Sequence, residues 1–136
     1  MPLFDHIGIS VDDIERAIAE FDPVMTALGC EREDAAGSCS WWDGENVGLI
    51  LFPARDAGTG PHVHGRVGWQ HLAFRVASRA EVDRLHAVAV GAGWAAVREP
   101  KEYPRFTDRY YAAFLESSDG IRIEFMFNPP REGASG

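Results

Sequence analysis

The chain has 136 residues, of which 46% are hydrophobic and 25% charged, a composition typical of one folded domain. Its 13 basic and 21 acidic residues give a net charge of −8, which disfavours binding to nucleic acid and to anionic membrane surfaces. We expect neither a transmembrane helix nor a secretory signal, because no run of about 18 apolar residues occurs and residues 1–13 lack a basic region. These features predict a cytoplasmic protein, whose Cys30 and Cys39 are then free thiols.

One pattern of elements occurs twice along the chain. HIGISV at residues 6–11 alternates with the period of a strand, and a similar segment, HLAFRV, recurs at 71–76. A helical pattern follows each segment, and strand-like segments after turn signals end the halves at 47–52 and 121–127. The sequence therefore predicts an α+β fold with the order βαβββ, twice. Within one domain, 1–136, we expect a first module at about 3–53, a linker at 54–68, a second module at about 69–129 and a flexible tail at 130–136.

The two predicted helices have recognisable ends. A capping side chain precedes each apolar periodic pattern, and a glycine follows each one. Pro23 lies inside the first helix and predicts a kink or a break there. The residues expected at the helix ends are Asp12 or Asp13 and Gly29 in the first half, and Ser78 and Gly93 in the second.

Strand alternation puts three potential metal ligands on one side of the predicted sheets. The apolar rows of the strands should pack on the helices, so His6, His71 and Glu124 face the other way. Two imidazoles and one carboxylate form a facial triad that leaves coordination positions open for substrate and water. A single histidine at a strand start is equally compatible with a structural role, but two at equivalent repeat positions favour metal binding.

The hairpin that ends in Glu124 supplies a candidate proton donor. If Leu115 pairs with Ile121, then Tyr110 and Phe114 flank Glu124 on the same face. Tyr110 would then donate a proton or hydrogen bond to a bound substrate, or else simply pack.

The chain resembles the vicinal oxygen chelate superfamily, also called the glyoxalase/bleomycin-resistance/dioxygenase group. The resemblance covers about residues 4–129 and rests on DHIGISVDD, GWQHLAFRVASRAEVD and YYAAFLESSDGIRIEFM. It implies paired βαβββ modules whose curved mixed sheets enclose one divalent metal, such as Fe, Mn, Ni or Zn, at His6, His71 and Glu124. Ile50 stands where four-ligand members of the family carry a further carboxylate. The ligand set therefore resembles fosfomycin-modifying transferases and ring-cleaving dioxygenases more than lactoylglutathione lyases.

The same resemblance implies a homodimer, because short members with two modules often build each site across an interface. His6 of one chain would join His71 and Glu124 of the other, although a site within one chain stays open. The residues that we expect to line the substrate cavity are Ile50, Phe52, Arg75, Phe114, Arg122 and Met126. The two arginines either hold an anionic group or form ordinary surface contacts.

Two loop segments have weaker signals. Residues 99–108 form either a lid, with Lys101, Arg105 or Arg109 touching substrate, or a plain surface loop. His62 and His64 lie in the glycine-rich linker without a neighbouring acid, so we expect exposed loop histidines there.

Two functional hypotheses follow from these residues. The first is a metal-dependent lyase, transferase or ring-cleaving dioxygenase that acts on a small oxygenated or aromatic molecule, with Tyr110 and Glu124 at the reacting centre. The alternative is a metal-free protein that binds and sequesters an aromatic or hydrophobic antibiotic by stacking and burial.

Overall fold

The computed structural model describes residues 2–131 and confirms the predicted order of elements. The first half contains β1 (His6–Val11), α1 (Ile14–Ala27), β2 (Glu31–Ala35), β3 (Ser38–Trp42) and β4 (Gly48–Pro53). The second half contains β5 (Leu72–Arg75), α2 (Arg79–Gly91), β6 (Ala95–Glu102), β7 (Tyr111–Glu116) and β8 (Arg122–Phe127). Most of the tail predicted at 130–136 lies outside the described residues.

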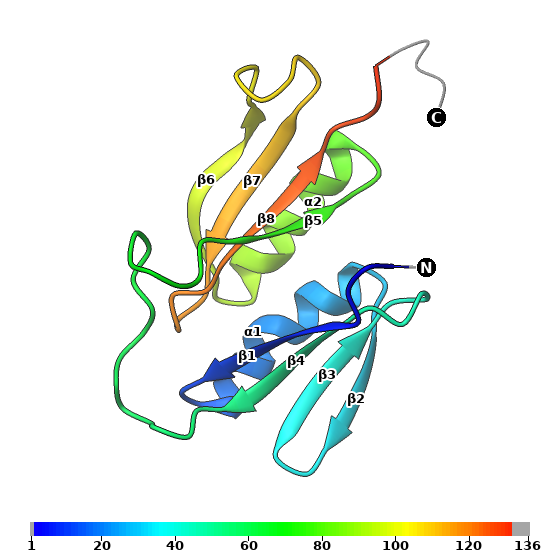
Figure 1. Ribbon diagram of the computed structural model, residues 1–136. Coiled ribbons are helices and arrows are strands. Elements are labelled where there is room, and N and C mark those ends of the chain that lie inside the picture. The colour runs from blue at the N-terminus through cyan, green and yellow to red at the C-terminus, as the bar shows by residue number, and fades with distance from the viewer. Residues whose placement is uncertain (1, 132–136) are drawn as a thin grey trace.

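Each half forms its own four-stranded mixed sheet, with one helix against one of its faces (Figure 1). The strand orders are β1-β4-β3-β2 and β5-β8-β7-β6, and the first strand of each half runs parallel to the last. This arrangement confirms the α+β class with two βαβββ modules. It also makes β1 and β5, the strands that begin each half, one edge of each sheet, with β2 and β6 at the opposite edges.

The helix ends follow the predicted capping pattern. The Asp13 carboxylate accepts a hydrogen bond from the Arg16 amide at 3.1 Å, and the Ser78 hydroxyl accepts one from the Glu81 amide at 3.1 Å. The α1 helix continues through Pro23, so the break that Pro23 suggested does not occur. Burial of α1 side chains on both sides of the proline offsets the lost hydrogen bond.

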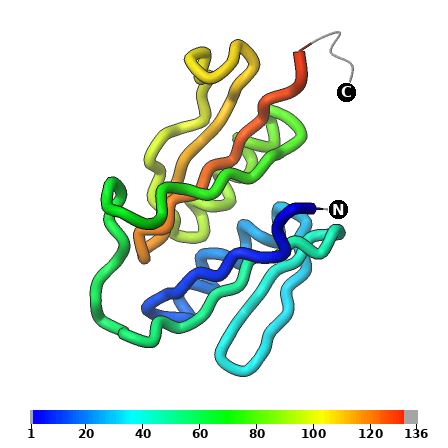
Figure 2. Tube along the Cα trace, in the orientation of Figure 1, coloured from blue at the N-terminus to red at the C-terminus, as the bar shows by residue number. Residues whose placement is uncertain are grey.

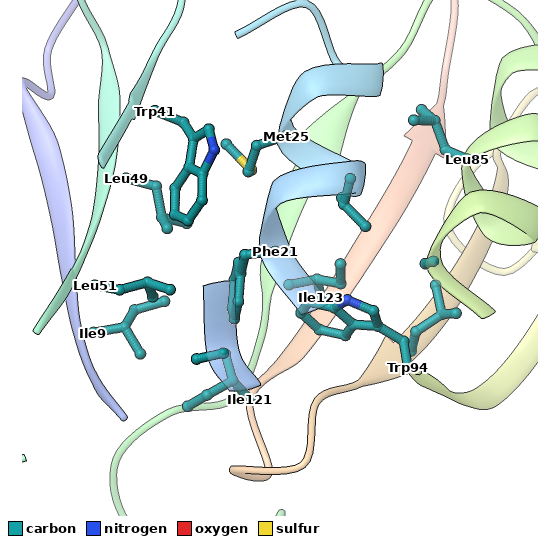
Figure 3. Packing of buried hydrophobic residues seen from close by; sticks show 14 of the residues in the cluster. Ile9, Phe21, Met25, Trp41, Leu49, Leu51, Leu85, Trp94, Ile121 and Ile123 are labelled. Atoms are coloured by element: carbon teal, nitrogen blue, oxygen red, sulfur yellow. The ribbon is translucent and has the colours of Figure 1, made fainter. Parts of the chain in front are cut away.

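One hydrophobic core joins the two modules. Figure 3 shows side chains from both modules meeting around Phe21 of α1. The Trp94 ring lies edge-on to Phe21 with centroids 4.8 Å apart, and its indole N–H donates to the Glu20 carbonyl at 2.7 Å. The buried Glu20 carboxylate in turn accepts hydrogen bonds from the Ser118 amide and hydroxyl, at 3.0 and 2.8 Å. These contacts hold α1 against the turn between β7 and β8.

The segment between β4 and β5, green in Figure 2, runs along one side of the molecule from one sheet to the other. Its His62 amide donates to the Asp119 carbonyl at 2.9 Å, and the His62 ring lies 2.8 Å from the Trp69 carbonyl. Gly120 has a φ of +76°, and a Cβ there would lie 1.8 Å from the His62 carbonyl oxygen. The prediction of exposed histidines is therefore wrong, because His62 and His64 are both half-buried against the second module.

Both cysteines are free thiols, as predicted. Cys39 is buried, and its thiol donates to the Asp34 carboxylate at 3.2 Å. Burial and this hydrogen bond raise the pKa of Cys39 to about 11, so the thiol stays protonated at neutral pH. Within residues 2–131, no helix is both long and apolar enough to cross a lipid bilayer.

Candidate metal centre

Two of the three predicted ligands meet where β5 and β8 run side by side. Ala73 pairs with Glu124 in the parallel register, and His71 lies two residues before Ala73 on the same face. The His71 Nε2 atom lies 3.1 Å from Glu124 Oε1. Glu124 is only 2% exposed, while the His71 side chain is 36% exposed. A buried carboxylate and a reachable imidazole therefore point at one position.

Tyr110 holds the second oxygen of this carboxylate. Its hydroxyl donates a hydrogen bond to Glu124 Oε2. Burial, together with the Glu124 carboxylate, raises the pKa of Tyr110 well above its ordinary value. The phenol therefore stays protonated across the neutral range and keeps donating to Glu124.

Gln70 determines which nitrogen of His71 carries the proton. The Gln70 amide oxygen is hydrogen-bonded to His71 Nδ1, and the Gln70 amide nitrogen lies 3.5 Å from His64 Nε2. Because an amide oxygen only accepts, a neutral His71 carries its proton on Nδ1. Its Nε2 lone pair then faces Glu124 Oε1, which also bears only lone pairs. Two such atoms 3.1 Å apart suit a shared cation, and this geometry fits the donor chemistry of a divalent metal.

The β7–β8 register differs from the predicted one by two residues. Leu115 pairs with Ile123 rather than Ile121, so Phe114 lies opposite Glu124. The five-residue turn is shifted by one position, from 116–120 to 117–121, and the Ser117 hydroxyl there accepts hydrogen bonds from two amides. A slip of two residues preserves the faces, so Phe114 still flanks the site, with its ring edge-on to His71 at 5.6 Å between centroids.

A pocket of about 220 Å³ opens beside His71. Arg122 lines it, but its guanidinium donates to the Glu116 carboxylate at 2.8 and 3.0 Å and is therefore already paired. Sequence reasoning missed several of its walls, although Gln70 directly precedes His71 and could have been noticed as its orienting partner. The residues that line the pocket are His64, Gln70, His71, Arg98, Tyr103, Arg105, Phe106, Phe114 and Arg122.

His6 does not join this pair. It lies on β1 in the other sheet, where its Nδ1 atom is 2.7 Å from the Asp5 carboxylate and its ring is 6.2 Å from that of Trp42. Among residues 2–131, no three His, Cys, Asp or Glu side chains gather closely enough to hold a metal ion. The described part of one chain thus brings together two of the three predicted ligands.

The registers of the two sheets are equivalent at this point. Gly8 pairs with Ile50 in the first sheet as Ala73 pairs with Glu124 in the second, so an apolar side chain occupies the position that matches the carboxylate. Phe52, also on β4, is 43% exposed, and its ring lies over Gly8.

Two more predicted lining residues lie on the second sheet. Met126 pairs with Arg75 there, two residues along β8 from Glu124. Arg75 lines a separate, largely apolar cleft of about 360 Å³ between the β1 and β5 edges. The pocket beside His71 is thus not formed by Arg75, Met126 or the β4 residues.

The family model of the Glyoxalase/Bleomycin resistance protein/Dioxygenase superfamily matches residues 3–125. The chain belongs to this superfamily. It is 26% identical over 122 residues to the uncharacterized protein YqjT of Bacillus subtilis, which covers 89% of this chain and 95% of that one.

Solved structures agree with this assignment. The structure of a candidate glyoxalase from Bacillus halodurans is 27% identical in sequence and superposes with a TM-score of 0.76. The match covers 93% of this chain and 96% of the Bacillus halodurans chain. The fosfomycin resistance protein FosX from Mesorhizobium loti is 15% identical with a TM-score of 0.67, covering 95% and 94%, and this likeness shows the fold alone.

Proposed function

We propose that the protein is a metal-dependent enzyme that acts on a small oxygenated or aromatic molecule. His71 and Glu124 would hold one divalent cation, together with His6 of a second copy of the chain. The observation that carries this proposal is the approach of two lone-pair atoms, Nε2 of the exposed His71 and Oε1 of the buried Glu124, to 3.1 Å. Without a cation or an extra proton between them, these atoms repel each other.

The position of His6 supports a site completed across an interface. His6 lies on β1 and His71 immediately precedes β5, and both strands are sheet edges with one neighbour each among the described residues. The cleft between these edges is lined by apolar side chains, including Phe4, which is 67% exposed. A two-fold pairing that buries this cleft would form the same composite site twice in the dimer.

The surroundings of the two ligands suit a reaction centre. A bound divalent metal would polarise substrate oxygens or lower the pKa of a bound water. Tyr110 would hold the Glu124 carboxylate in place, and Gln70 would hold the His71 ring with Nε2 directed at the site. The Phe114 ring would keep water from one side of the imidazole.

Membership of this superfamily supports the proposal of a metal site. The donor atoms also support it, because imidazole and carboxylate ligands are shared by Fe, Mn, Ni and Zn sites. Ile50 in place of a fourth carboxylate favours three protein ligands, which leaves positions open for two oxygens of one substrate. This chelation would be the central step of the reaction, whether it is a lyase, transferase or dioxygenase reaction.

Metal content tests the proposal. Protein purified without a histidine tag should hold about one Fe, Mn, Ni or Zn per chain by elemental analysis. A His71→Ala variant should lose it, while His86→Ala, which removes a histidine from α2, should keep it. No metal after incubation with each of these ions would refute the proposal and would favour the metal-free binding protein instead.

A further inference from the structure

The pocket beside His71 concentrates positive charge in a chain whose net charge is −8. Arg98 on β6, Arg105 in the following loop and Arg122 on β8 all line it. Arg122 is neutralised by its fork of hydrogen bonds to Glu116. Neither Arg98 nor Arg105 has an ion-pair partner among residues 2–131, and the Arg105 guanidinium instead lies over the Phe106 ring at 4.8 Å. Two uncompensated guanidiniums therefore face this hollow.

Two buried polar atoms in the pocket walls have no partner. They are the hydroxyl oxygen of Tyr103, a residue that is only 5% exposed, and the Nδ1 atom of His64. Buried hydroxyls and imidazole nitrogens are normally hydrogen-bonded, because leaving them unpaired costs free energy. The unpaired Tyr103 hydroxyl, beside two free guanidiniums, offers a donor to an anionic acceptor.

The remaining wall of the pocket is aromatic. Tyr103 stacks on Phe106 with centroids 5.6 Å apart, and Phe114 meets Tyr103 edge-on at 5.9 Å. Phe106 is 48% exposed, and the Arg105 guanidinium lies over its ring, so an aromatic plane and a positive charge occur together at the pocket wall. Flat rings and guanidinium planes favour a planar, unsaturated ligand over a bulky aliphatic one.

We propose that this pocket recognises the oxyanion group of a small planar molecule, a carboxylate or a phosphonate. Arg98 and Arg105 would supply the opposing charge, and the Tyr103 hydroxyl would donate one hydrogen bond. His71 also lines the pocket, so the far end of such a molecule reaches the candidate metal centre. The inference rests on the proposed function in treating this molecule as the substrate, but anion recognition itself needs no metal.

Binding to metal-free protein tests this assignment. Protein treated with EDTA is titrated with benzoate, phenylphosphonate and the neutral analogue benzamide, and binding is followed by ligand-detected NMR. We expect both anions to bind at least about tenfold more tightly than benzamide, since charge-assisted hydrogen bonds are stronger than hydrogen bonds between neutral groups. The tighter of the two anions identifies the oxyanion that the pocket prefers. Raising NaCl to about 1 M, where the Debye length is about 3 Å, should weaken the anions and leave benzamide unchanged.

Variants assign the effect to the pocket. A double variant, Arg98→Gln with Arg105→Gln, should weaken anion binding about tenfold or more. Arg66→Gln removes an exposed arginine of the linker and is the matched control, expected to bind as the unmodified chain does. All three positions are exposed, so the variants should fold, and far-UV circular dichroism checks this.

Several results would overturn the assignment. These are equal binding of benzoate and benzamide, no binding of either anion, or equal losses in the double variant and in Arg66→Gln. The titration uses metal-free protein, so its failure is separable from a failure of the proposed function. If the protein holds metal but shows no preference for anions, the enzyme proposal stands and the anion-pocket proposal is refuted. If it prefers anions but holds no metal, the anion-pocket proposal stands and the metal proposal is refuted.

Discussion

The hydrogen bond from Tyr110 to Glu124 allows a sharp test, because the next residue provides its own control. Tyr110→Phe removes one hydroxyl that donates to a carboxylate only 2% exposed. Hydrogen bonds to charged groups contribute about 1.5–3 kcal/mol, and the burial of Glu124 limits how well water can replace the lost donor. Tyr111→Phe removes the same atom from a bond to the exposed Asp83, at 2.6 Å, and should cost less than about 1 kcal/mol.

The assay is urea unfolding of EDTA-treated protein, followed by far-UV circular dichroism. Tyr110→Phe should lower the free energy of unfolding by about 1.5–3 kcal/mol, with an unchanged m-value. If the metal proposal holds, the same variant should also lose about 10–100-fold in metal affinity, measured by competition with a chelator. Equal stability losses in the two tyrosine variants would refute the assignment of Tyr110 as the residue that positions Glu124.

Three further predictions concern the fold. Trp94→Ala should lower the free energy of unfolding by about 3–5 kcal/mol, because Trp94 is buried and donates to the Glu20 carbonyl. Urea unfolding measures this loss, and a loss below about 1 kcal/mol would contradict the shared core. Gly120→Ala should cost more than about 1 kcal/mol, since a Cβ there meets the His62 carbonyl at 1.8 Å; an unchanged melting temperature would contradict this contact. The raised pKa of Cys39 adds stability that is complete below pH 9.0, the ordinary value, and is lost as pH rises toward about 11. The urea midpoint should therefore fall over this range in the unmodified chain and less in Cys39→Ala, and equal falls would contradict the burial of the thiol.

The sequence predicts the fold well, because its signals are local and repeated. Alternation in residues 6–11 and 71–76 and capping at Ser78 each depend on neighbours a few positions away. The same alternation assigned His71 and Glu124 to one face, and the structure brings them to 3.1 Å. Periodicity could not fix the β7–β8 register, because a shift of two residues leaves every face unchanged.

The rest of the site depends on contacts between distant segments. Gln70 contacts His71 as its immediate neighbour, but His64 lies 3.5 Å from the Gln70 amide nitrogen only because the linker turns back, and no local pattern encodes that turn. The burial of the Tyr103 hydroxyl likewise depends on how the loop after β6 packs over β7. His6 shares its repeat signal with His71, yet the sequence alone left open which copy of the chain it serves.

Mixing two inactive variants tests the central claim, a metal site shared between two chains, most directly. His6→Ala and Glu124→Gln should each hold almost no metal when purified alone. When the two variants are refolded together in equal amounts, half of the dimers should contain one chain of each kind. Each such dimer would regain one intact site. The account predicts recovery to about one metal per four chains by elemental analysis. No recovery in mixed dimers, with the unmodified chain still holding metal, would contradict a shared site.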